Sequence, residues 1–490
     1  MFSEMLKRIE GVLRSLIIIL FVTGLMASST YGQPLAKSQE GATSSKRSLT
    51  LDQVIQLALF ANRTIRGSEY GIKSQKYGLI AAESEFEWKF APTTTATTAK
   101  DANRLGTGLT LTKKSRFGPT ISLTPKVIYN DRIENSNAVD GQVDINLTIP
   151  LLRGWGKEAN LSAIESARYS SRSIQRSHHL TKVNVVIDTV RAVYAIIEQK
   201  ELLRLNQLQT QSFKNHVVMA AAKEKIGLAT PMDVYRAQIR LKDVQDRLNR
   251  SQEALQNAQD HLKLIIAVSL DKALPVTAHM TYQPLDITVE KALETAFKNR
   301  VELEQTVDEI NDLERSSRVA RHLTNPQLDL VGRYNHLGLD DPFQNDLESA
   351  ENYWSISLVS TTDWRRTSEK TNYQRSLLAV EAAKLNRWAL NDAIRREVRQ
   401  TYDALLKSEE RVQIRKEQIQ QANGKLALAR VKFIHDMADN FDVIEAQTEL
   451  QSAQANMLAA KIEHIVGRYQ LRAAMGTLLE YHLNVAYDSP

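Results

Sequence analysis

Four acidic residues near the end of the chain form a compact group. Asp436, Asp439, Asp442 and Glu445 fall within ten residues. Asp442 and Glu445 are three residues apart, so a helix would place both carboxylates on one face. Such a run most often marks a solvated helix face, but this one lies where a long helical pattern reverses direction.

The chain lacks the residue patterns that accompany catalysis or ligand binding. Gly154-Trp-Gly-Lys157 has neither the glycine spacing nor the following Ser or Thr of a phosphate-binding loop, and it predicts a strand-to-helix turn instead. Cysteine is absent, which excludes disulfides and thiolate sites. Basic and acidic residues are interleaved and the formal net charge is only +6, which disfavours nucleic-acid binding. We therefore expect no enzyme, no cofactor and no nucleic-acid partner.

The histidines do not form a metal site either. His178 and His179 have no acid or histidine at metal-ligand spacing, so we expect them on a solvated face and expect no bound metal. His261 and His464 lie at or beside apolar helix positions, and we expect both to be packed among neighbouring side chains.

The elements that would position the acidic group are long helices. The 490 residues include only 19 Gly and 11 Pro, and from residue 157 to 226 neither occurs. Apolar or small residues recur with the three-four spacing that is typical of coiled-coil seams. The first such row is Val234, Ala237, Leu241, Val244, Leu248, Ser251, Leu255, Ala258, Leu262 and Ile265; the second is Val443, Ala446, Leu450, Ala453, Met457, Ala460, His464, Gly467, Leu471 and Ala474.

The chain repeats its own plan. The segment starting Leu49-Thr-Leu-Asp matches the segment starting Ile287-Thr-Val-Glu, and in both the threonine is a predicted helix N-cap. The motif around Asp233-Val matches the one around Asp442-Val at an offset of 209, against 238 for the first pair. The first half therefore has an extra segment, expected between Phe90 and Pro150.

Short alternating segments in that region predict β-strands. The first half offers four candidates, beginning at Pro92, Thr107, Thr120 and Val143, with a polar loop over residues 131–141. The second half offers two, Gln327–Tyr334 and Tyr353–Val359. Each half thus predicts a helix, a strand region, a very long helix, a turn and a returning helix.

The N-terminus predicts export. Lys7, Arg8 and Arg14 precede an apolar run of 12 residues, Leu16–Ala27, and small residues follow it. That run is shorter than the ~20 residues a membrane-spanning helix needs, so it favours a cleaved signal peptide over an uncleaved anchor.

These features together resemble the outer-membrane efflux protein family, the TolC-like trimeric export ducts. The motifs are the twin threonine-capped helix starts, Pro150-Leu-Leu-Arg-Gly-Trp-Gly, and Gly227-x-x-Thr-Pro-x-Asp-Val. The resemblance implies a mostly α fold with a small β part, internally duplicated. In proteins of this family, a homotrimer forms a membrane β-barrel that is continued by a periplasmic coiled-coil barrel of α-helices. It also implies an outer-membrane location with a long periplasmic portion.

The resemblance further implies partners and site residues. The expected partners are two further copies of the chain, outer-membrane lipid, a periplasmic adaptor and an inner-membrane transporter. Substrates would pass through the channel passively, as in efflux or type I secretion. The implied entrance residues are Asp442, Glu445, Asp439 and Asp436, the implied gate contact is Asp233, and the implied adaptor-contacting turns contain Gly227, Thr230, Pro231, Phe433 and Ala438.

Three departures from the family plan stand out. Asp436 occupies the position that matches Gly227, and Ala438 occupies the position of the arginine that would face Asp233. The first half also offers four strand candidates where the family has two, which leaves open whether two of them form an insertion at a barrel rim. The alternative to a duct is a periplasmic or surface coiled-coil scaffold without a pore.

The expected organisation divides the chain into five parts. These are a signal peptide (1–32), a polar lead-in (33–48), a first repeat (49–286) with strands over about 90–150 and a helical hairpin over about 157–267, a second repeat (287–480) with strands over about 327–360 and a helical hairpin over about 366–477, and a C-terminal tail (481–490).

Overall fold

The computed structural model describes residues 48–99, 102–132, 138–281, 283–338, 351–435, 437–438 and 440–481. These residues belong to one compact unit, Ser48–Pro490. The expected signal peptide, nearly all of the lead-in and most of the C-terminal tail lie outside the described residues, as do Asp436 and Asp439.

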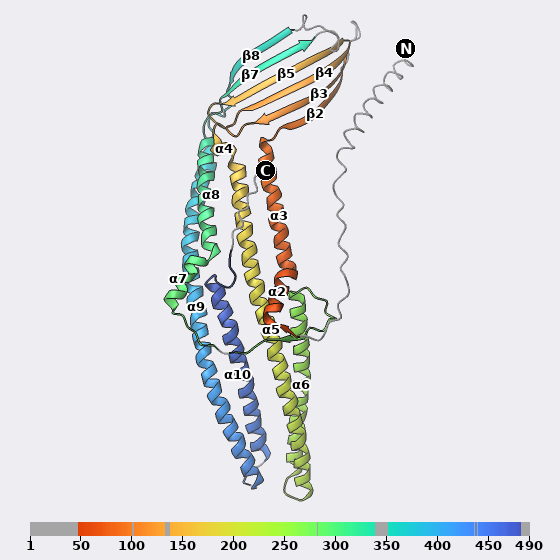
Figure 1. Ribbon diagram of the computed structural model, residues 1–490, viewed down its shortest axis with the longest axis vertical. Helices are drawn as coiled ribbons and strands as arrows, with labels where there is room; N and C mark the ends of the chain where they lie inside the picture. Colours follow the sequence, from red (N-terminus) through yellow and green to blue (C-terminus); the bar gives the residue numbers. More distant parts are fainter. Residues whose placement is uncertain are drawn as a thin grey trace, which may run out of the picture. The chain divides into compact units, whose positions relative to one another are not determined.

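Long helices dominate this unit (Figure 1). α5 and α9 contain 64 and 68 residues. The helices are α2 (Leu51–Ala61), α3 (Arg63–Glu83), α4 (Lys157–Asn160), α5 (Ser162–Lys225), α6 (Pro231–Ile265), α7 (Val289–Asn299), α8 (Val301–Leu323), α9 (Thr367–Ile434) and α10 (Asn440–Ala474), with a 3-10 turn η1 (Ser84–Phe86). Among the described residues, no helix combines the length and apolar content required to cross a bilayer.

The two halves begin in the same way. Thr50 caps α2 and Thr288 caps α7, each accepting a hydrogen bond from the backbone N–H three residues later. Each capping threonine is followed by a short helix and then by a longer one. These are α2 and α3 in the first half and α7 and α8 in the second. The predicted helix starts are thereby confirmed. In each, the capping threonine accepts a hydrogen bond from a backbone N–H that has no partner within the helix.

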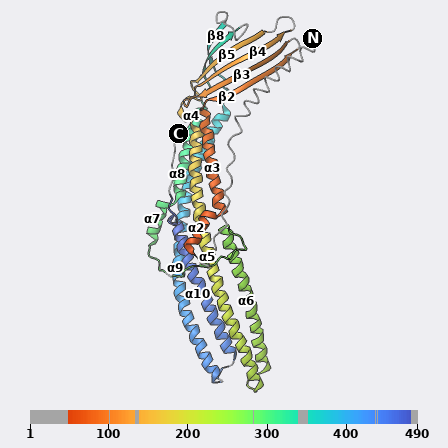
Figure 2. The ribbon, with the colours of Figure 1, turned by 45° about the vertical axis from the view of Figure 1, so that its right-hand side comes forward.

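The two rows of seam positions lie between helices. α6 pairs with α5 and α10 pairs with α9, so each half forms a long helical hairpin (Figures 1 and 2). All members of both rows are buried or half-buried. Ala237, Val244, Ala446 and Ala453 have no exposed surface. Small residues at these positions allow the helix axes to approach closely, as the heptad pattern predicted.

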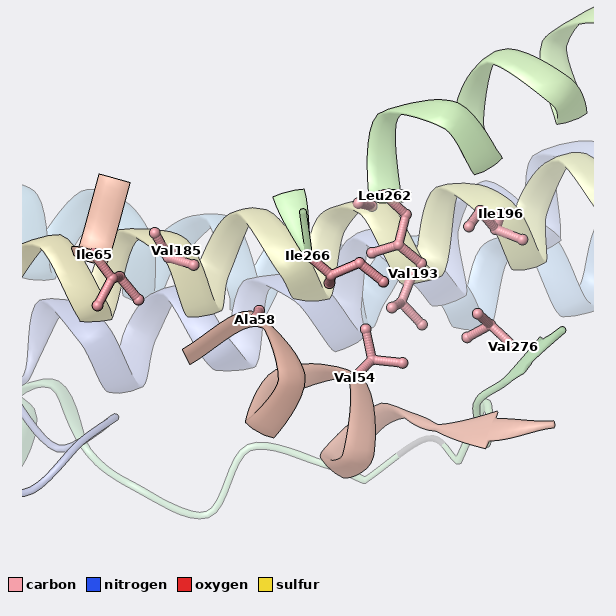
Figure 3. Packing of buried hydrophobic residues seen from close by; sticks show 10 residues of the cluster. Val54, Ala58, Ile65, Val185, Val193, Ile196, Leu262, Ile266 and Val276 are labelled. Carbon is pink, nitrogen blue, oxygen red and sulfur yellow. The ribbon is translucent and has the colours of Figure 1, made fainter. Parts of the chain in front are cut away.

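The largest apolar cluster joins α2, α3, α5 and α6. It contains Val54, Ala58, Ile65, Val185, Ala192, Val193, Ile196, Leu262, Ile266 and Val276 (Figure 3). A two-stranded parallel sheet, β1 (Leu49–Thr50) with β6 (Val276–Thr277), borders it. The cluster fixes the short helix α2 against the middle of the long hairpin.

A six-stranded antiparallel sheet follows the ends of α3 and α8. Its order is β2-β3-β4-β5-β7-β8, so neighbours in sequence are neighbours in the sheet. The strands are β2 (Lys89–Ala99), β3 (Ala102–Lys114), β4 (Thr120–Arg132), β5 (Ala138–Pro150), β7 (Asp329–Gly338) and β8 (Glu351–Val359). The polar loop expected over residues 131–141 is shorter than predicted, because β4 continues to Arg132 and β5 begins at Ala138.

Two expectations about histidines were wrong. His178 and His179 are half-buried rather than solvated: Nδ1 of His178 is 2.6 Å from Oγ of Ser68, and the His179 ring meets the Tyr481 ring edge-on. α3 packs on this stretch of α5, which the spacing of the two histidines does not reveal. His261 is exposed, whereas His464 is fully buried as expected and lies 3.1 Å from Oγ of Ser408.

Candidate functional site

One face of the six-stranded sheet is apolar. Residues paired across strands share a face, and the register places the following on one side: Phe90, Pro92 and Ala96 of β2; Leu105, Leu109 and Leu111 of β3; Ile121, Leu123 and Val127 of β4; Val143, Ile145 and Leu147 of β5; Leu330 and Tyr334 of β7; and Trp354, Ile356 and Leu358 of β8. The helices do not cover this face: Phe90, Trp354 and Ile356 are 64%, 75% and 69% exposed.

The opposite face is mostly polar, with Ile128 and Val331 as buried apolar members. It carries Thr93, Thr95, Thr110, Thr112, Ser122, Thr124, Lys126, Asp144, Asn146, Thr148, Arg333, Asn335, Ser355 and Ser357. Lys126 and Asp144 form an ion pair at 2.9 Å between β4 and β5. Thr124 donates to Thr110 at 3.2 Å between β3 and β4. A sheet with one polar face and one exposed apolar face suits a boundary between water and hydrocarbon.

The first hairpin reverses through a helix C-cap. Leu228 N–H donates to Lys223 O and Gly227 N–H to Glu224 O, both at 2.9 Å, and Gly227 has φ +76°. This is the hydrogen-bond pattern of a Schellman motif, in which glycine takes the left-handed position. In the second hairpin Met437 N–H donates to Lys432 O at 2.8 Å, the equivalent bond at the offset of 209.

Both hairpin tips expose apolar side chains. Leu228 is 63% exposed, and Met437, which stands at the matching position of the second hairpin, is 74% exposed. Met232 and Phe441 form a second matching pair, at 58% and 51%. The same kind of surface therefore occurs twice, once on each tip.

The predicted turn residues have different surroundings. Gly227, Thr230 and Pro231 are exposed, and Ala438 is half-buried. Phe433 packs against the apolar cluster of the second hairpin, with the Lys223 ammonium 4.0 Å above its ring. Phe433 therefore joins the two hairpins by a cation–π contact.

Asp233 is engaged within its own helix. Its Oδ2 accepts from Thr230 N–H at 3.0 Å and from Thr230 Oγ1 at 2.7 Å, which completes a capping box at the start of α6. These hydrogen bonds lower the pKa of the Asp233 carboxyl below its ordinary value. Arg236, one turn along α6, lies 3.9 Å from it.

Asp442 and Glu445 are exposed in the first turns of α10. Glu445 lies 3.7 Å from Nζ of Lys425, which also pairs with Glu449 at 2.7 Å. The hydrogen bond that the Lys425 ammonium donates to Glu449, together with the negative charges of Glu445 and Glu449, raises the pKa of Lys425. A groove of about 730 Å³ between α5, α6, α9 and α10 is lined by Glu445, Glu449 and Lys425 together with Arg240 and Arg247. The groove therefore carries charges of both signs.

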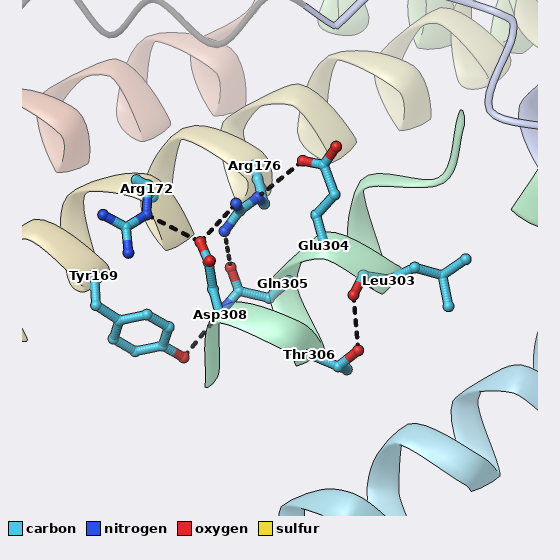
Figure 4. A network of polar contacts seen from close by, with 8 residues as sticks. All are labelled: Tyr169, Arg172, Arg176, Leu303, Glu304, Gln305, Thr306 and Asp308. Atoms are coloured by element: carbon cyan, nitrogen blue, oxygen red, sulfur yellow. Dashed lines mark hydrogen bonds and ion pairs between the residues drawn. The ribbon is translucent and has the colours of Figure 1, made fainter. Parts of the chain in front are cut away.

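An arginine network that the sequence analysis missed joins α5 to α8 (Figure 4). Arg176 is buried, and its Nη2 lies 2.7 Å from Oδ2 of Asp308, while Nε of Arg172 lies 2.9 Å from the same atom. Burial alone would raise the pKa of Asp308, but the hydrogen bonds from Arg176 and Arg172 outweigh it and lower the pKa. The four-residue spacing of Arg168, Arg172 and Arg176 was the available signal.

The comparisons with known proteins agree with this geometry. Residues 111–268 match the sequence model of the family described as outer membrane efflux protein. No curated protein matches the chain. The match supports the resemblance predicted from the sequence motifs, and with it the expected outer-membrane location.

Solved outer-membrane channels share the fold. VceC from Vibrio cholerae is 13% identical with a TM-score of 0.66, over 87% of this chain and 96% of that one. The CmeC channel from Campylobacter jejuni is 16% identical with a TM-score of 0.65, over 92% and 95%. The MtrE channel from Neisseria gonorrhoeae, in its open state, is 13% identical with a TM-score of 0.65, over 92% and 98%. The mostly helical TolC-like fold is thereby confirmed.

Proposed function

We propose that the chain is the outer-membrane channel of a tripartite efflux or type I secretion system. It would conduct substrates passively from an inner-membrane transporter and a periplasmic adaptor to the exterior. The observation that carries this proposal is the two-faced sheet continued by two long helical hairpins. The apolar face of the sheet, with Phe90, Trp354 and Ile356, would contact lipid. The opposite, threonine-rich face of the sheet would line the water-filled passage.

The proposal requires several copies of the chain. Six strands with two free edges are too few to enclose an aqueous channel, and unpaired edges in lipid would leave backbone N–H and C=O groups without partners. A homotrimer, the assembly that the family resemblance implies, would supply the missing strands.

The hairpin tips are the proposed adaptor contact. Leu228, Met232, Met437 and Phe441 form matching exposed apolar patches at the ends of the two hairpins, and exposed turns are frequent sites of partner binding. Photo-crosslinking residues at Ala229 and Ala438 should capture an adaptor in cells.

The proposed periplasmic entrance contains Asp442 and Glu445. Three copies would bring six carboxylates around one axis, and such a ring would favour cations. Lys425 would reduce this preference, since it neutralises part of the charge of Glu445 and Glu449. Asp439 and Asp436, which lie outside the described residues, would add to the ring.

A single purification distinguishes the duct from a scaffold without a pore. A duct requires detergent for extraction, has the native mass of a trimer, and conducts ions in a planar bilayer. A scaffold would be released by carbonate at high pH and would not conduct. Release by carbonate would therefore overturn the proposal.

A further inference from the structure

We infer that all six strands of each chain span the membrane, so that three copies close an 18-stranded barrel instead of one built from four strands per chain. This inference rests on the proposed trimeric channel and specifies its membrane part. It decides whether the additional strand pair of the first half lies in the barrel wall or at its rim.

The sheet ladder runs through all six strands without a change of partner. Each strand pairs antiparallel with the next, from Lys89 opposite Thr112 at one end to Asp329 opposite Val359 at the other. The strands contain 9 to 13 residues, and a tilted strand needs about 9–11 residues to cross a bilayer. Each strand is therefore long enough to span.

The apolar face extends onto the edge strand of the first half through Phe90, Pro92 and Ala96, with Thr94 as a polar member on the same side. On β2, Phe90 and Pro92 share the side of Leu111 and Leu109 on β3. On β8, Trp354 and Ile356 lie on that same side of the sheet. A rim insertion would face water on both sides and would have no need for this alternation, whereas a lipid-facing wall requires it.

The two edge strands of the sheet, β2 and β8, run in opposite directions. β2 leaves the end of α3, and β8 leads into α9, so the two strands run antiparallel within one sheet of six. β8 of one copy can consequently add to β2 of the next copy in the antiparallel pairing used throughout the sheet. Each such contact buries the same two edges, which is the condition for a closed ring.

The helices below these two edges each carry a row of exposed apolar side chains. Tyr70, Tyr77 and Ile80 of α3 are 66%, 70% and 49% exposed, and Leu378, Leu385 and Trp388 of α9 are 70%, 71% and 75% exposed. Counted at ~1.5 Å per residue from the helix ends, the rows cover roughly 5–20 Å and 15–30 Å below the sheet.

α3 and α9 are also the outer members of one packed series. α3 packs on α5, α5 on α8, and α8 on α9. The two rows overlap at about 15–20 Å below the sheet, so Leu378 of α9 in one copy can meet Tyr70 of α3 in the next copy while β8 pairs with β2.

The strand number sets the width of the passage. With strands ~4.8 Å apart and tilted by ~45°, 12 strands give a backbone diameter of ~26 Å, whereas 18 strands give ~39 Å. A barrel of 18 strands has as many strands as porins that enclose an aqueous channel. It would pass larger solutes than a 12-stranded barrel, which has four strands per chain.

Cysteine pairs can test the closure directly, because the natural chain contains no cysteine. One set combines Thr93→Cys or Thr95→Cys on β2 with Ser355→Cys or Ser357→Cys on β8. The matched control set combines Ser122→Cys or Thr124→Cys on β4 with the same β8 variants. All six positions lie on the polar face. Neighbouring strands place cysteines within disulfide range, about 4.4–6.8 Å between Cα atoms.

Oxidation of the purified full-length protein should link chains through at least one β2–β8 pair and through none of the β4–β8 pairs. Capture through β4–β8 pairs alone would overturn the inference. Electron cryomicroscopy of the unmodified trimer provides an independent count, with 18 strands expected and 12 contradicting it. A trimeric pore with 12 strands would reject this inference alone, whereas a monomer without conductance would reject the proposed function.

Discussion

Asn62 ties the break between α2 and α3 to the end of α6. Its Nδ2 donates to Ile265 O at 2.8 Å, and its Oδ1 accepts from the N–H groups of Thr64 and Ile65. In the second half Arg300 occupies the matching place and donates to Ala474 O at 3.5 Å. The two halves thus preserve one connection, from the start of a longer helix to the end of the returning helix, with different side chains.

The first prediction concerns this connection. Asn62→Ala should lower stability by about 1–3 kcal/mol, because it removes a helix cap and leaves the Ile265 carbonyl without its side-chain donor. Asn62→Asp keeps the capping oxygen and removes only the donor, so its loss should be smaller. Thermal unfolding in detergent, followed by circular dichroism, would measure both. Equal unfolding temperatures for Asn62→Ala and the unmodified protein would contradict this assignment.

Local patterns predicted much of the fold. Threonine caps, the three-four spacing around Ala237 and Ala446, and the alternation of the strands depend on neighbours within a few residues, so the sequence alone carries them. Contacts between distant segments were missed. Neither the burial of Arg176 against Asp308 nor the position of Phe433 under Lys223 follows from local spacing, because each depends on which helices meet.

The candidate site shows the same division. The alternation identified strands in the first half, but whether all four join one sheet depends on long-range pairing. The acidic group was visible as a cluster, whereas the basic side chains around it, Lys425, Arg240 and Arg247, come from α9 and α6 and are brought to it only by folding.

The second prediction concerns acid stability. The pKa of Asp308 is lowered in the folded chain from an ordinary value of 3.8. The stability that its pairing with Arg176 and Arg172 contributes is therefore complete above about pH 4, and it is lost as the pH falls through the lowered folded pKa. Asp308→Asn should destabilise the protein at pH 7, and its deficit should shrink as the pH falls below 4.

A control for this prediction is Asp188→Asn. Asp188 is 58% exposed and lies 3.6 Å from Arg191, so its ion pair is screened by solvent. Thermal unfolding of both variants between pH 7 and pH 3 should show a pH-dependent deficit for Asp308→Asn only. A deficit that stays constant with pH would mean that the Asp308 charge is not responsible.

The third prediction concerns the hairpin tips. Leu228→Asp with Met437→Asp should weaken adaptor capture at Ala229 by roughly tenfold or more, since burying each apolar side chain contributes about 1.5–3 kcal/mol. Both positions are exposed, so the unfolding temperature should not change. Leu264→Asp, which alters an equally exposed leucine at the other end of α6, is the control. Unchanged capture by the double variant would place the adaptor elsewhere.

The fourth prediction concerns ion selectivity at the proposed entrance. Asp442→Asn with Glu445→Gln keeps the side-chain shapes and removes six negative charges per trimer. The double variant should lose cation preference, measured as a reversal potential closer to zero in a salt gradient. Part of the field of such a ring survives physiological salt, because the Debye length of about 8 Å is comparable to the width of a narrowed entrance.

Lys425 supplies a change of opposite sign for the same measurement. Lys425→Gln removes the cation that lies between Glu445 and Glu449, so cation preference should rise if these carboxylates face the passage. The control Glu290→Gln with Glu294→Gln removes as many negative charges as Asp442→Asn with Glu445→Gln, but from exposed positions on α7. It should leave the reversal potential unchanged. If neither the acidic double variant nor Lys425→Gln shifts it, Asp442 and Glu445 lie on the outer surface of the tip, where they would have no effect on permeating ions.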